Sequence, residues 1–254
     1  MAITIKSERE IELMAEAGKI LEQVHNELEK ALRPGMSTKD IDTLGEEIIR
    51  SYGCIPSFLN YNGYPASICV SVNQEVVHGI PDKHRIIQEG DIVSLDAGVI
   101  YKGYHSDAAR THAVGEVSEE AKKLIQVTKE SFFEGIKFAK AGNHLFDISG
   151  AIGRYAEERG YGVVRDLCGH GIGTALHEAP EIPNYEVGRK GVRLRPGMTL
   201  AIEPMINIGT HEVDWLDDDW TVVTRDGSLS AHYENTILIT EGEPRILSLT
   251  CENE

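Results

Sequence analysis

Acidic residues stand at two points where the surrounding chain is apolar. Asp96 and Glu203 each end a mostly apolar run, and Asp107 and Glu234 follow near the next predicted strand of each half. A buried carboxylate is costly unless it is paired, protonated or bound to a metal ion. Any one of these acids is explained equally well by a turn, a helix cap or a salt bridge. Four that converge on one interior place cannot all ionise without divalent cations, so as a set they predict a metal site.

Histidines accompany these acids. His170 lies between small residues in the segment CGHGIG, His177 follows seven residues later, and His78 ends a β-branched run before a turn. Flanking glycines let the backbone approach closely and hold an imidazole at a fixed angle. These glycines do not indicate a nucleotide-binding loop, because the surrounding βαβ unit is missing. Of the ten histidines, we interpret the other seven as surface residues, among them His25, His84 and His144.

A set of carboxylates with one imidazole and no thiolate suits particular metal ions. It favours Mn, Fe(II) or Co, and less strictly Zn. Two such ions about 3.5–4 Å apart would bind a shared hydroxide as the nucleophile and polarise a carbonyl group. The residues therefore predict a hydrolytic centre with two divalent metal ions.

The acids occupy equivalent positions in an internal repeat. Four residues of the first half have counterparts 107 residues later, in the pairs Gly35 and Gly142, Gly53 and Gly160, Gly90 and Gly197, and Asp96 and Glu203. One offset shared by helix and strand signals is hard to explain as coincidence. We therefore expect a single domain over residues 1–254, with pseudo-symmetric halves of about 1–115 and 116–254.

Amphipathic helices and β-branched runs must position these residues. One predicted helix begins at the capping box of Ser7 and Glu10 and ends before Pro34, and apolar residues at intervals of three and four predict others over about 37–51, 118–136 and 145–159. Predicted strands cover 68–70, 91–99, 199–208, 221–223 and 236–239. Helices and strands alternate in blocks, which predicts an α+β fold.

Composition excludes several classes of protein. The 254 residues carry 25 Lys and Arg against 41 Asp and Glu, a net charge of −16, which argues against sequence-independent binding to nucleic acid or anionic membranes. The first ten residues are charged and do not resemble a signal peptide. The cysteines, Cys54, Cys69, Cys168 and Cys251, form no Cys-x-x-Cys pair and are expected to be reduced thiols. We expect a soluble cytoplasmic protein.

Taken together, these residues resemble the methionine aminopeptidases, a family of metallopeptidases. The resemblance covers nearly the whole chain and includes the segments NYNGYP (60–65), VHGIP (77–81), SLD (94–96), GHGIG (169–173) and EPM (203–205). It implies the family's pseudo-two-fold pita-bread fold, with a central antiparallel sheet flanked by helices. That fold would also account for the internal repeat.

The resemblance implies a role for each metal ligand. Asp96 would chelate one of two divalent ions (Co, Mn, Fe(II) or Zn), Asp107 and Glu234 would bridge both, and His170 and Glu203 would complete the second. Glu203 would also transfer protons to and from the bridging water as general base.

The same resemblance implies the substrate contacts. His177 would hydrogen-bond the scissile carbonyl oxygen, and His78 would lie near the leaving amide nitrogen. The free α-amine of the substrate would bind the metal near Asp96, so that only N-terminal residues are removed. The methionine side chain would lie among six residues, which are Phe58, Tyr61, Tyr64, Cys69, Leu176 and Trp220.

Some details of the substrate pocket stay open. Cys69 is explained equally well by core packing. Phe58 stands where the family commonly has Cys, and Leu176 where it commonly has Phe, so the shape of the pocket is less certain than the metal site. The resemblance also implies a structural Na or K ion near Asn73 and Ser230.

The implied function is removal of the initiator methionine from nascent proteins whose second residue is small. The implied enzyme is a cytoplasmic monomer that associates with ribosomes. His170 and Glu203 are 33 residues apart, and Glu203 and Glu234 are 31 apart, which favours the bacterial type I enzymes over type II enzymes with their long insertion. An Xaa-Pro aminopeptidase or dipeptidase shares the five ligands, but usually has an extra N-terminal domain for which this length leaves no room. A non-catalytic binding protein of the same fold is disfavoured because all five ligands are present.

Overall fold

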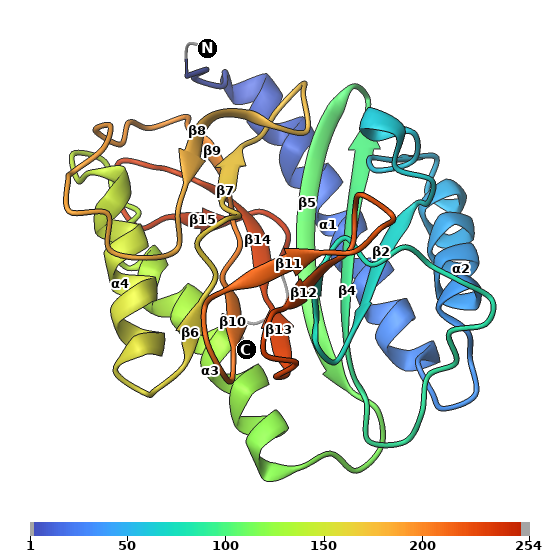
Figure 1. Cartoon of the computed structure of the whole chain (residues 1–254). Helices are drawn as coiled ribbons and strands as arrows, with labels where there is room; N and C mark the ends of the chain where they lie inside the picture. Colours follow the sequence, from blue (N-terminus) through green and yellow to red (C-terminus); the bar gives the residue numbers. More distant parts are fainter. Residues whose placement is uncertain (1–2, 250–254) are drawn as a thin grey trace.

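Helices form where the chain has capping signals and an apolar stripe. In the computed structural model, which describes residues 3–249, the Ser7 hydroxyl accepts a hydrogen bond from the Glu10 N–H and the Glu10 carboxylate accepts one from the Ser7 N–H. Ser37 and Asp40 form the same capping box at the second helix. The four α-helices of the described chain are α1 (Glu8–Ala31), α2 (Thr38–Ser51), α3 (Glu119–Ile136) and α4 (Leu145–Glu157) (Figure 1). All four predicted helices are confirmed.

An antiparallel sheet runs through the centre of the molecule (Figure 1). In the described chain it has nine strands, in the order β1-β4-β5-β14-β9-β7-β8, with β2 also paired to β4 and β15 to β14. Its strands are β1 (Ile55–Pro56), β2 (Ile68–Val72), β4 (Ile92–Tyr101), β5 (Tyr104–Ala113), β7 (Gly169–Gly171), β8 (Glu178–Ile182), β9 (Thr199–Ile202), β14 (Glu234–Leu238) and β15 (Arg245–Ile246). The two halves of the chain join where β5 pairs with β14.

Smaller elements complete the described fold. Two three-stranded sheets have the orders β13-β10-β6 and β11-β12-β3. Their strands are β3 (Glu75–Val77), β6 (Gly162–Val163), β10 (Met205–Asn207), β11 (Val213–Trp215), β12 (Val222–Thr224) and β13 (Ser230–His232), and a short 3-10 helix, η1, covers Tyr61–Gly63. In Figure 1 the β11–β12 hairpin crosses in front of the main sheet, and α1 packs behind β4 and β5.

The internal repeat is visible in equivalent backbone hydrogen bonds. The Gly35 N–H donates to the Ile87 carbonyl, and at the 107-residue offset the Gly142 N–H donates to the Leu194 carbonyl. Gly35 and Gly142 have φ values of 91° and 92°, in the left-handed region that favours glycine. These equivalent bonds support the predicted pseudo-two-fold symmetry, and the helices with their antiparallel sheets confirm the α+β fold.

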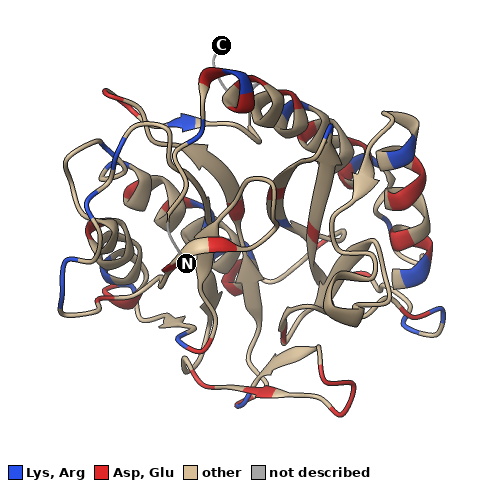
Figure 2. Cartoon of the chain, turned by 90° about the horizontal axis from the view of Figure 1, so that it is seen from above, with Lys and Arg blue, Asp and Glu red and all other residues tan. Residues whose placement is uncertain are grey.

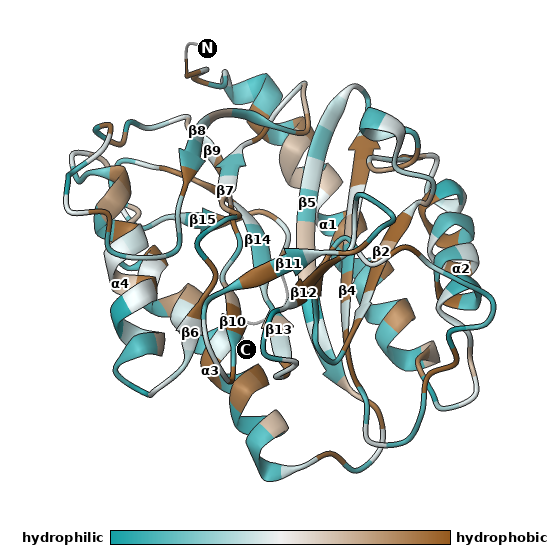
Figure 3. Cartoon of the chain, in the orientation of Figure 1, coloured by the Kyte–Doolittle hydropathy of each residue, from teal (hydrophilic) through white to brown (hydrophobic). Residues whose placement is uncertain are grey.

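Apolar clusters hold the helices to the sheet in each half. Leu21 of α1 and Leu95 of β4 belong to one buried cluster, and Phe132 of α3 and Leu200 of β9 belong to another. In Figure 3, β2 and β4 are largely hydrophobic, whereas most of the helix α2 is hydrophilic. Burying one large apolar side chain contributes about 1.5–3 kcal/mol. These clusters therefore keep rigid the strands that carry the acidic residues.

Two predictions about strands are wrong in detail. Residues 199–208 form two strands in different sheets, β9 and β10, because Pro204 has no N–H to donate and restricts the backbone of Glu203. Asp96 does not end its strand, since β4 continues to Tyr101. Asp96 is therefore held within a long hairpin rather than at its edge.

The cysteines of the described chain are all free. They are Cys54, Cys69 and Cys168, while Cys251 lies outside the described residues. None of the helices within residues 3–249 is long and apolar enough to cross a membrane.

Candidate metal centre

Five side chains suited to metal binding come from neighbouring strands of the main sheet. In sheet order, Asp96 lies in β4, Asp107 in β5, Glu234 in β14, Glu203 directly after β9 and His170 in β7. All five line one cavity. In Figure 2, acidic segments lie within the central strands, whereas Lys and Arg lie mostly around the outside. The fold therefore collects negative charge at its centre.

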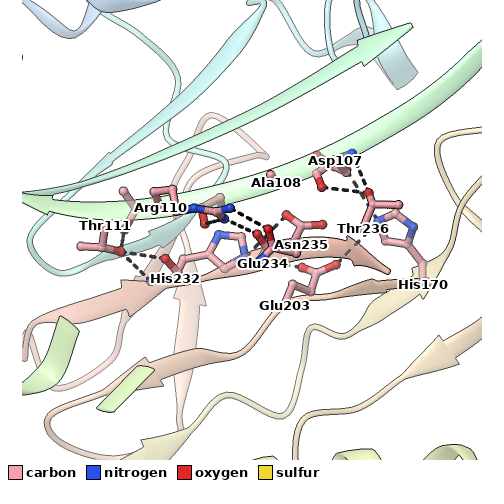
Figure 4. Close-up of polar contacts among 12 residues, drawn as sticks. Asp107, Ala108, Arg110, Thr111, His170, Glu203, His232, Glu234, Asn235 and Thr236 are labelled. Atoms are coloured by element: carbon pink, nitrogen blue, oxygen red, sulfur yellow. Dashed lines mark hydrogen bonds and ion pairs between the residues drawn. The ribbon is translucent and has the colours of Figure 1, made fainter. Parts of the chain in front are cut away.

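The ligand atoms lie close together. One atom each of Asp107, His170 and Glu234 lies within 4.8 Å of the other two. His170 Nε2 is 3.8 Å from Asp107 Oδ2 and 3.6 Å from Glu203 Oε1, and Figure 4 shows these side chains gathered in one region. Asp96 Oδ1, Asp107 Oδ1 and Glu234 Oε1 are buried without a hydrogen-bond partner in the described chain. Buried oxygens without partners are rare and indicate a site for an ion or water.

A backbone contact orients the ring of His170. Its Nδ1 lies 2.9 Å from the Gly171 carbonyl oxygen. Because a carbonyl only accepts, Nδ1 carries the hydrogen and Nε2 presents its lone pair to the carboxylates, which is the form that binds a metal. Burial, with the nearby His177, lowers the pKa of His170 to about 3. The imidazole is therefore neutral at pH 7.

The carboxyl groups oppose one another's ionisation. Burial raises the pKa of Asp107 to about 8. Burial and then the charge of Asp107 raise the pKa values of Asp96, Glu203 and Glu234 well above the ordinary range. Divalent cations among these groups would allow all four to ionise. The charges, the unpartnered oxygens and the donor types thus all fit a metal centre.

Apolar side chains form another part of the same cavity, whose volume is about 160 Å³. They include all six residues that the resemblance implies for the methionine side chain, namely Phe58, Tyr61, Tyr64, Cys69, Leu176 and Trp220. The rings of Tyr64 and Trp220 meet edge to face at 5.1 Å. Cys69 lies directly opposite Asp96 on the neighbouring strand, which places its side chain beside the acid. An apolar pocket lined by such rings suits a flexible thioether.

His177 reaches this cavity from the loop before β8. Its ring centroid is 4.1 Å from that of His170, and its Nδ1 is 2.7 Å from the Tyr61 hydroxyl. Burial raises the pKa of Tyr61 and lowers that of His177, so both groups are neutral at pH 7. A phenol that donates to Nδ1 leaves the ring hydrogen on Nε2, where a carbonyl oxygen can accept it.

His78 lines the cavity from the segment after β3. Its φ is 59°, in a region that residues other than glycine rarely adopt. The next residue is Gly79, and a Cβ at this position would lie 2.4 Å from the Val70 carbonyl oxygen, so no side chain fits there. Burial lowers the pKa of His78 to about 4. This tight junction holds a neutral imidazole 6.3 Å from the ring of Trp220.

The prediction that the other seven histidines lie at the surface is wrong for three of them. His25, His105 and His232 are 5%, 8% and 2% exposed. His25 and His105 have partners inside the protein, because His25 Nε2 lies 2.9 Å from the Ala108 carbonyl oxygen and His105 Nδ1 lies 2.9 Å from Ser57 Oγ. His84 is exposed and His144 is half-buried.

Of these, His232 lies beside two of the predicted metal ligands, a position that the sequence analysis did not predict. Its Nε2 is 3.8 Å from Glu203 Oε2 and 4.0 Å from Glu234 Oε2 (Figure 4). Neither ring nitrogen has a hydrogen-bond partner in the described chain. The sequence does contain a signal, since a histidine stands two residues before an acidic ligand in both halves, at His105-x-Asp107 and His232-x-Glu234.

Asn73 and Ser230 lie next to each other but do not line the cavity. The Ser230 N–H donates to the Asn73 carbonyl oxygen at 2.9 Å. The Asn73 amide is already bonded to Asp91 and to the Ile92 N–H, and the Ser230 hydroxyl to the Ile206 carbonyl oxygen. The predicted Na or K site near these residues stays a prediction.

Residues 12–241 match the profile of metallopeptidase family M24. The chain belongs to this family. Among M24 proteins it is similar to the methionine aminopeptidase of Clostridium acetobutylicum, with 58% identity over 250 residues that cover 98% of this chain and 100% of the relative. The crystal structure of methionine aminopeptidase from Thermotoga maritima has a TM-score of 0.96 and 47% identity, and the match covers 98% of this chain and 100% of that one. The predicted resemblance to methionine aminopeptidases and the predicted pita-bread fold are confirmed.

The M24 fold is shared with peptidases of other specificity. Xaa-Pro dipeptidase from Bacillus anthracis has a TM-score of 0.77 and 28% identity, and the match covers 97% of this chain and 62% of that one. As an M24 metallopeptidase the present chain is a metal-dependent hydrolase. Its choice of substrate depends on the cavity rather than on the fold.

Proposed function

We propose that this M24 enzyme uses two divalent metal ions to remove the N-terminal methionine from proteins whose second residue is small. The observation that carries this proposal is one cavity in which the acidic ligand set adjoins an apolar, aromatic pocket. A peptide whose first side chain fills the pocket would hold its first peptide bond beside the acids. Such a cavity suits an aminopeptidase for a flexible apolar residue.

The metal ions would be held by the five clustered ligands. Asp96 would bind one ion, His170 and Glu203 the other, and Asp107 and Glu234 both. When bound, the ions supply an activated water molecule and polarise the scissile carbonyl. The donor types favour Mn, Fe(II) or Co and accept Zn less strictly.

Protein side chains would handle the proton and the developing charge. Glu203 would take a proton from the attacking water and return it to the leaving amine. The Nε2–H of His177 would donate to the scissile carbonyl oxygen as it becomes negative. His78 would lie beside the nitrogen of the leaving residue.

Selection for a free N-terminus would follow from the acidic end of the cavity. The α-amine of the first residue would lie near Asp96, where an internal residue would instead require room for the preceding chain. The requirement for a small second residue rests on the resemblance to methionine aminopeptidases. The apolar residues described above would bind the methionine side chain.

The cellular setting is part of the same proposal. The enzyme would act on nascent chains in the cytoplasm, as a monomeric single domain of residues 1–254 that associates with ribosomes. The net charge of −16 argues against direct binding to RNA or anionic membranes, so the ribosome contact would not rest on a broad basic surface. A structural Na or K ion near Asn73 and Ser230 would complete the protein.

The decisive experiment is cleavage by metal-stripped enzyme to which Mn, Co or Fe(II) is added back singly. Products from Met-Ala-Ser, Met-Lys-Ser and Ala-Pro-Ser are identified by mass spectrometry, with Glu203→Gln as the matched inactive control. Metal-dependent loss of methionine from Met-Ala-Ser alone would support the proposal. Cleavage of Ala-Pro-Ser alone would assign the enzyme to the Xaa-Pro peptidases. No cleavage of any peptide by the metal-loaded protein would favour a binding function.

A further inference from the structure

A second, open groove adjoins the catalytic cavity. It has a volume of about 640 Å³ and shares His170 and His177 with the cavity. From these histidines it extends along β7 and β8 to Phe146 of α4 and to Arg189. Because His170 and His177 line both pockets and flank the place proposed for the reacting bond, a longer substrate would be able to pass from the cavity into this groove.

One carboxylate in this groove has no partner. Glu181 is exposed, and it forms no hydrogen bond or ion pair in the described chain. Glu178, by contrast, is bound to Lys6, and the Arg189 guanidinium lies over the Phe146 ring at 5.4 Å from its centroid. Of the two glutamates that line the groove, Glu181 is therefore the one free to pair with a ligand, while the Arg189 guanidinium beside Phe146 keeps its positive charge.

The sheet register places this charge beside the metal centre. Glu181 lies directly opposite His170 on the neighbouring strand, so both side chains leave the sheet on the same face. Neighbouring strands are about 4.8 Å apart, and an extended peptide advances about 3.3 Å per residue. A substrate chain that leaves the reacting bond along the groove therefore comes within reach of Glu181 at its third or fourth residue.

We propose that this groove binds the substrate polypeptide after the cleaved bond, and that Glu181 selects for Lys or Arg at the third or fourth residue, whichever side chain faces it. The inference rests on the proposed aminopeptidase function. A cationic side chain gains an ion pair with Glu181, whereas an acidic side chain is repelled by it. A partly exposed ion pair is worth up to about fivefold in binding.

Three peptides test this selection: Met-Ala-Lys-Lys-Ser, Met-Ala-Gln-Gln-Ser and Met-Ala-Glu-Glu-Ser. Each is assayed with metal-loaded wild type, Glu181→Gln, Glu181→Lys and the control Glu119→Lys. Glu119 begins α3, at the opposite end of the molecule from β8 in Figure 1, so its substitution changes the net charge without changing the groove.

We expect wild-type kcat/KM to be highest for the Lys peptide, lower for the Gln peptide and lowest for the Glu peptide. The highest and lowest values should differ about three- to fivefold. Glu181→Gln should bring the ratio of kcat/KM for the Lys peptide to kcat/KM for the Glu peptide close to one. Glu181→Lys should invert this ratio, and Glu119→Lys should leave it unchanged. In about 1 M salt the wild-type span should shrink, because the screening length falls to about 3 Å.

The possible failures are distinguishable. If wild type cleaves none of the peptides, the proposed function itself fails. If it cleaves all three at equal rates, or if Glu181→Lys changes all rates by one factor, the inference about the groove is overturned. It is also overturned if Glu119→Lys inverts the order, because net charge would then be the cause.

Discussion

The hydroxyl of Tyr61 lies 2.7 Å from Nδ1 of His177, and their ring centroids are 5.2 Å apart. Tyr61 comes from η1 in the first half of the chain and His177 from the loop before β8 in the second. The contact therefore ties a histidine of one half to the half that supplies Asp96 and Asp107. When the phenol donates in this contact, the ring hydrogen of His177 is on Nε2, from which it can donate into the cavity.

Loss of this hydroxyl should impair turnover more than binding. Tyr61→Phe keeps the ring that lines the pocket but removes a hydrogen bond worth about 1 kcal/mol. We expect kcat for Met-Ala-Ser to fall about five- to tenfold while KM changes little, as measured by steady-state kinetics.

A double mutant shows whether Tyr61 acts through His177. His177→Ala alone should mainly lower kcat. Adding Tyr61→Phe in that background should cost nothing further, because the partner is already absent. Equal losses in both backgrounds would mean that Tyr61 acts independently of His177.

Neutral substitutions of the acidic ligands should abolish activity without unfolding the protein. Asp96→Asn and Glu203→Gln keep the side-chain shape and remove a buried charge, so the circular dichroism spectrum should stay unchanged. Peptide cleavage and bound metal, measured by elemental analysis, should both be lost or sharply reduced. Glu157→Gln, at the exposed end of α4, is the matched control. Wild-type rates in either ligand variant would overturn the assignment of the metal centre.

Metal-free protein should lose stability as the pH rises from 6.5 to 8. Asp107 has a folded pKa of about 8 against an ordinary value of 3.8. Between these values the folded state holds a proton that the unfolded state has lost, so the free energy of unfolding falls with rising pH. Buried His78 and His170, with pKa values of about 4 and 3, have the opposite effect, but only below their ordinary value of 6.5.

Thermal denaturation with and without chelator measures this effect. One proton difference corresponds to about 1.4 kcal/mol per pH unit. Metal-loaded protein should not show the fall, because metal binds the deprotonated ligands. Asp107→Asn should reduce the slope of the metal-free protein. A metal-free Tm that is constant across this window would contradict the raised carboxyl pKa values.

A buried ion pair supports the loop that carries His177. Lys6 Nζ lies 2.5 Å from Glu178 Oε2, Lys6 is only 7% exposed, and Glu178 Oε1 accepts the Ala175 N–H at 3.4 Å. Lys6→Ala would leave the carboxylate without its cation. We expect a loss of about 1–3 kcal/mol in the free energy of unfolding, together with a lower kcat.

A conservative variant of Lys6 and a control variant on α1 test whether the positive charge of Lys6 is what matters. Lys6→Arg restores the cation and should recover most of the stability and of kcat. Lys19→Ala, on the exposed side of α1, should change neither. If Lys6→Ala retained wild-type kcat, the pair would have no part in positioning His177.

The helices and the acidic ligands could be predicted from the sequence because their signals are local. Ser7 and Glu10 are three residues apart and form the capping box that their spacing predicts. Asp96 and Glu203 stand out because a carboxylate is costly beside apolar neighbours. The internal repeat then relates one acid to the other. These patterns indicate which residues are buried, and the donor types indicate what they would bind.

Contacts between residues that are far apart in the sequence were decided by the tertiary structure and could not be predicted from the sequence. The Tyr61–His177 and Lys6–Glu178 contacts each join residues more than a hundred positions apart, and the placement of His232 beside Glu203 requires the pairing of β10 with β13. Glu181 faces the groove because of the register between β7 and β8. Periodicity in a sequence reports which face of an element is buried, but not which element covers it. Only packing and strand register decide that, because they depend on the free energy of the whole fold.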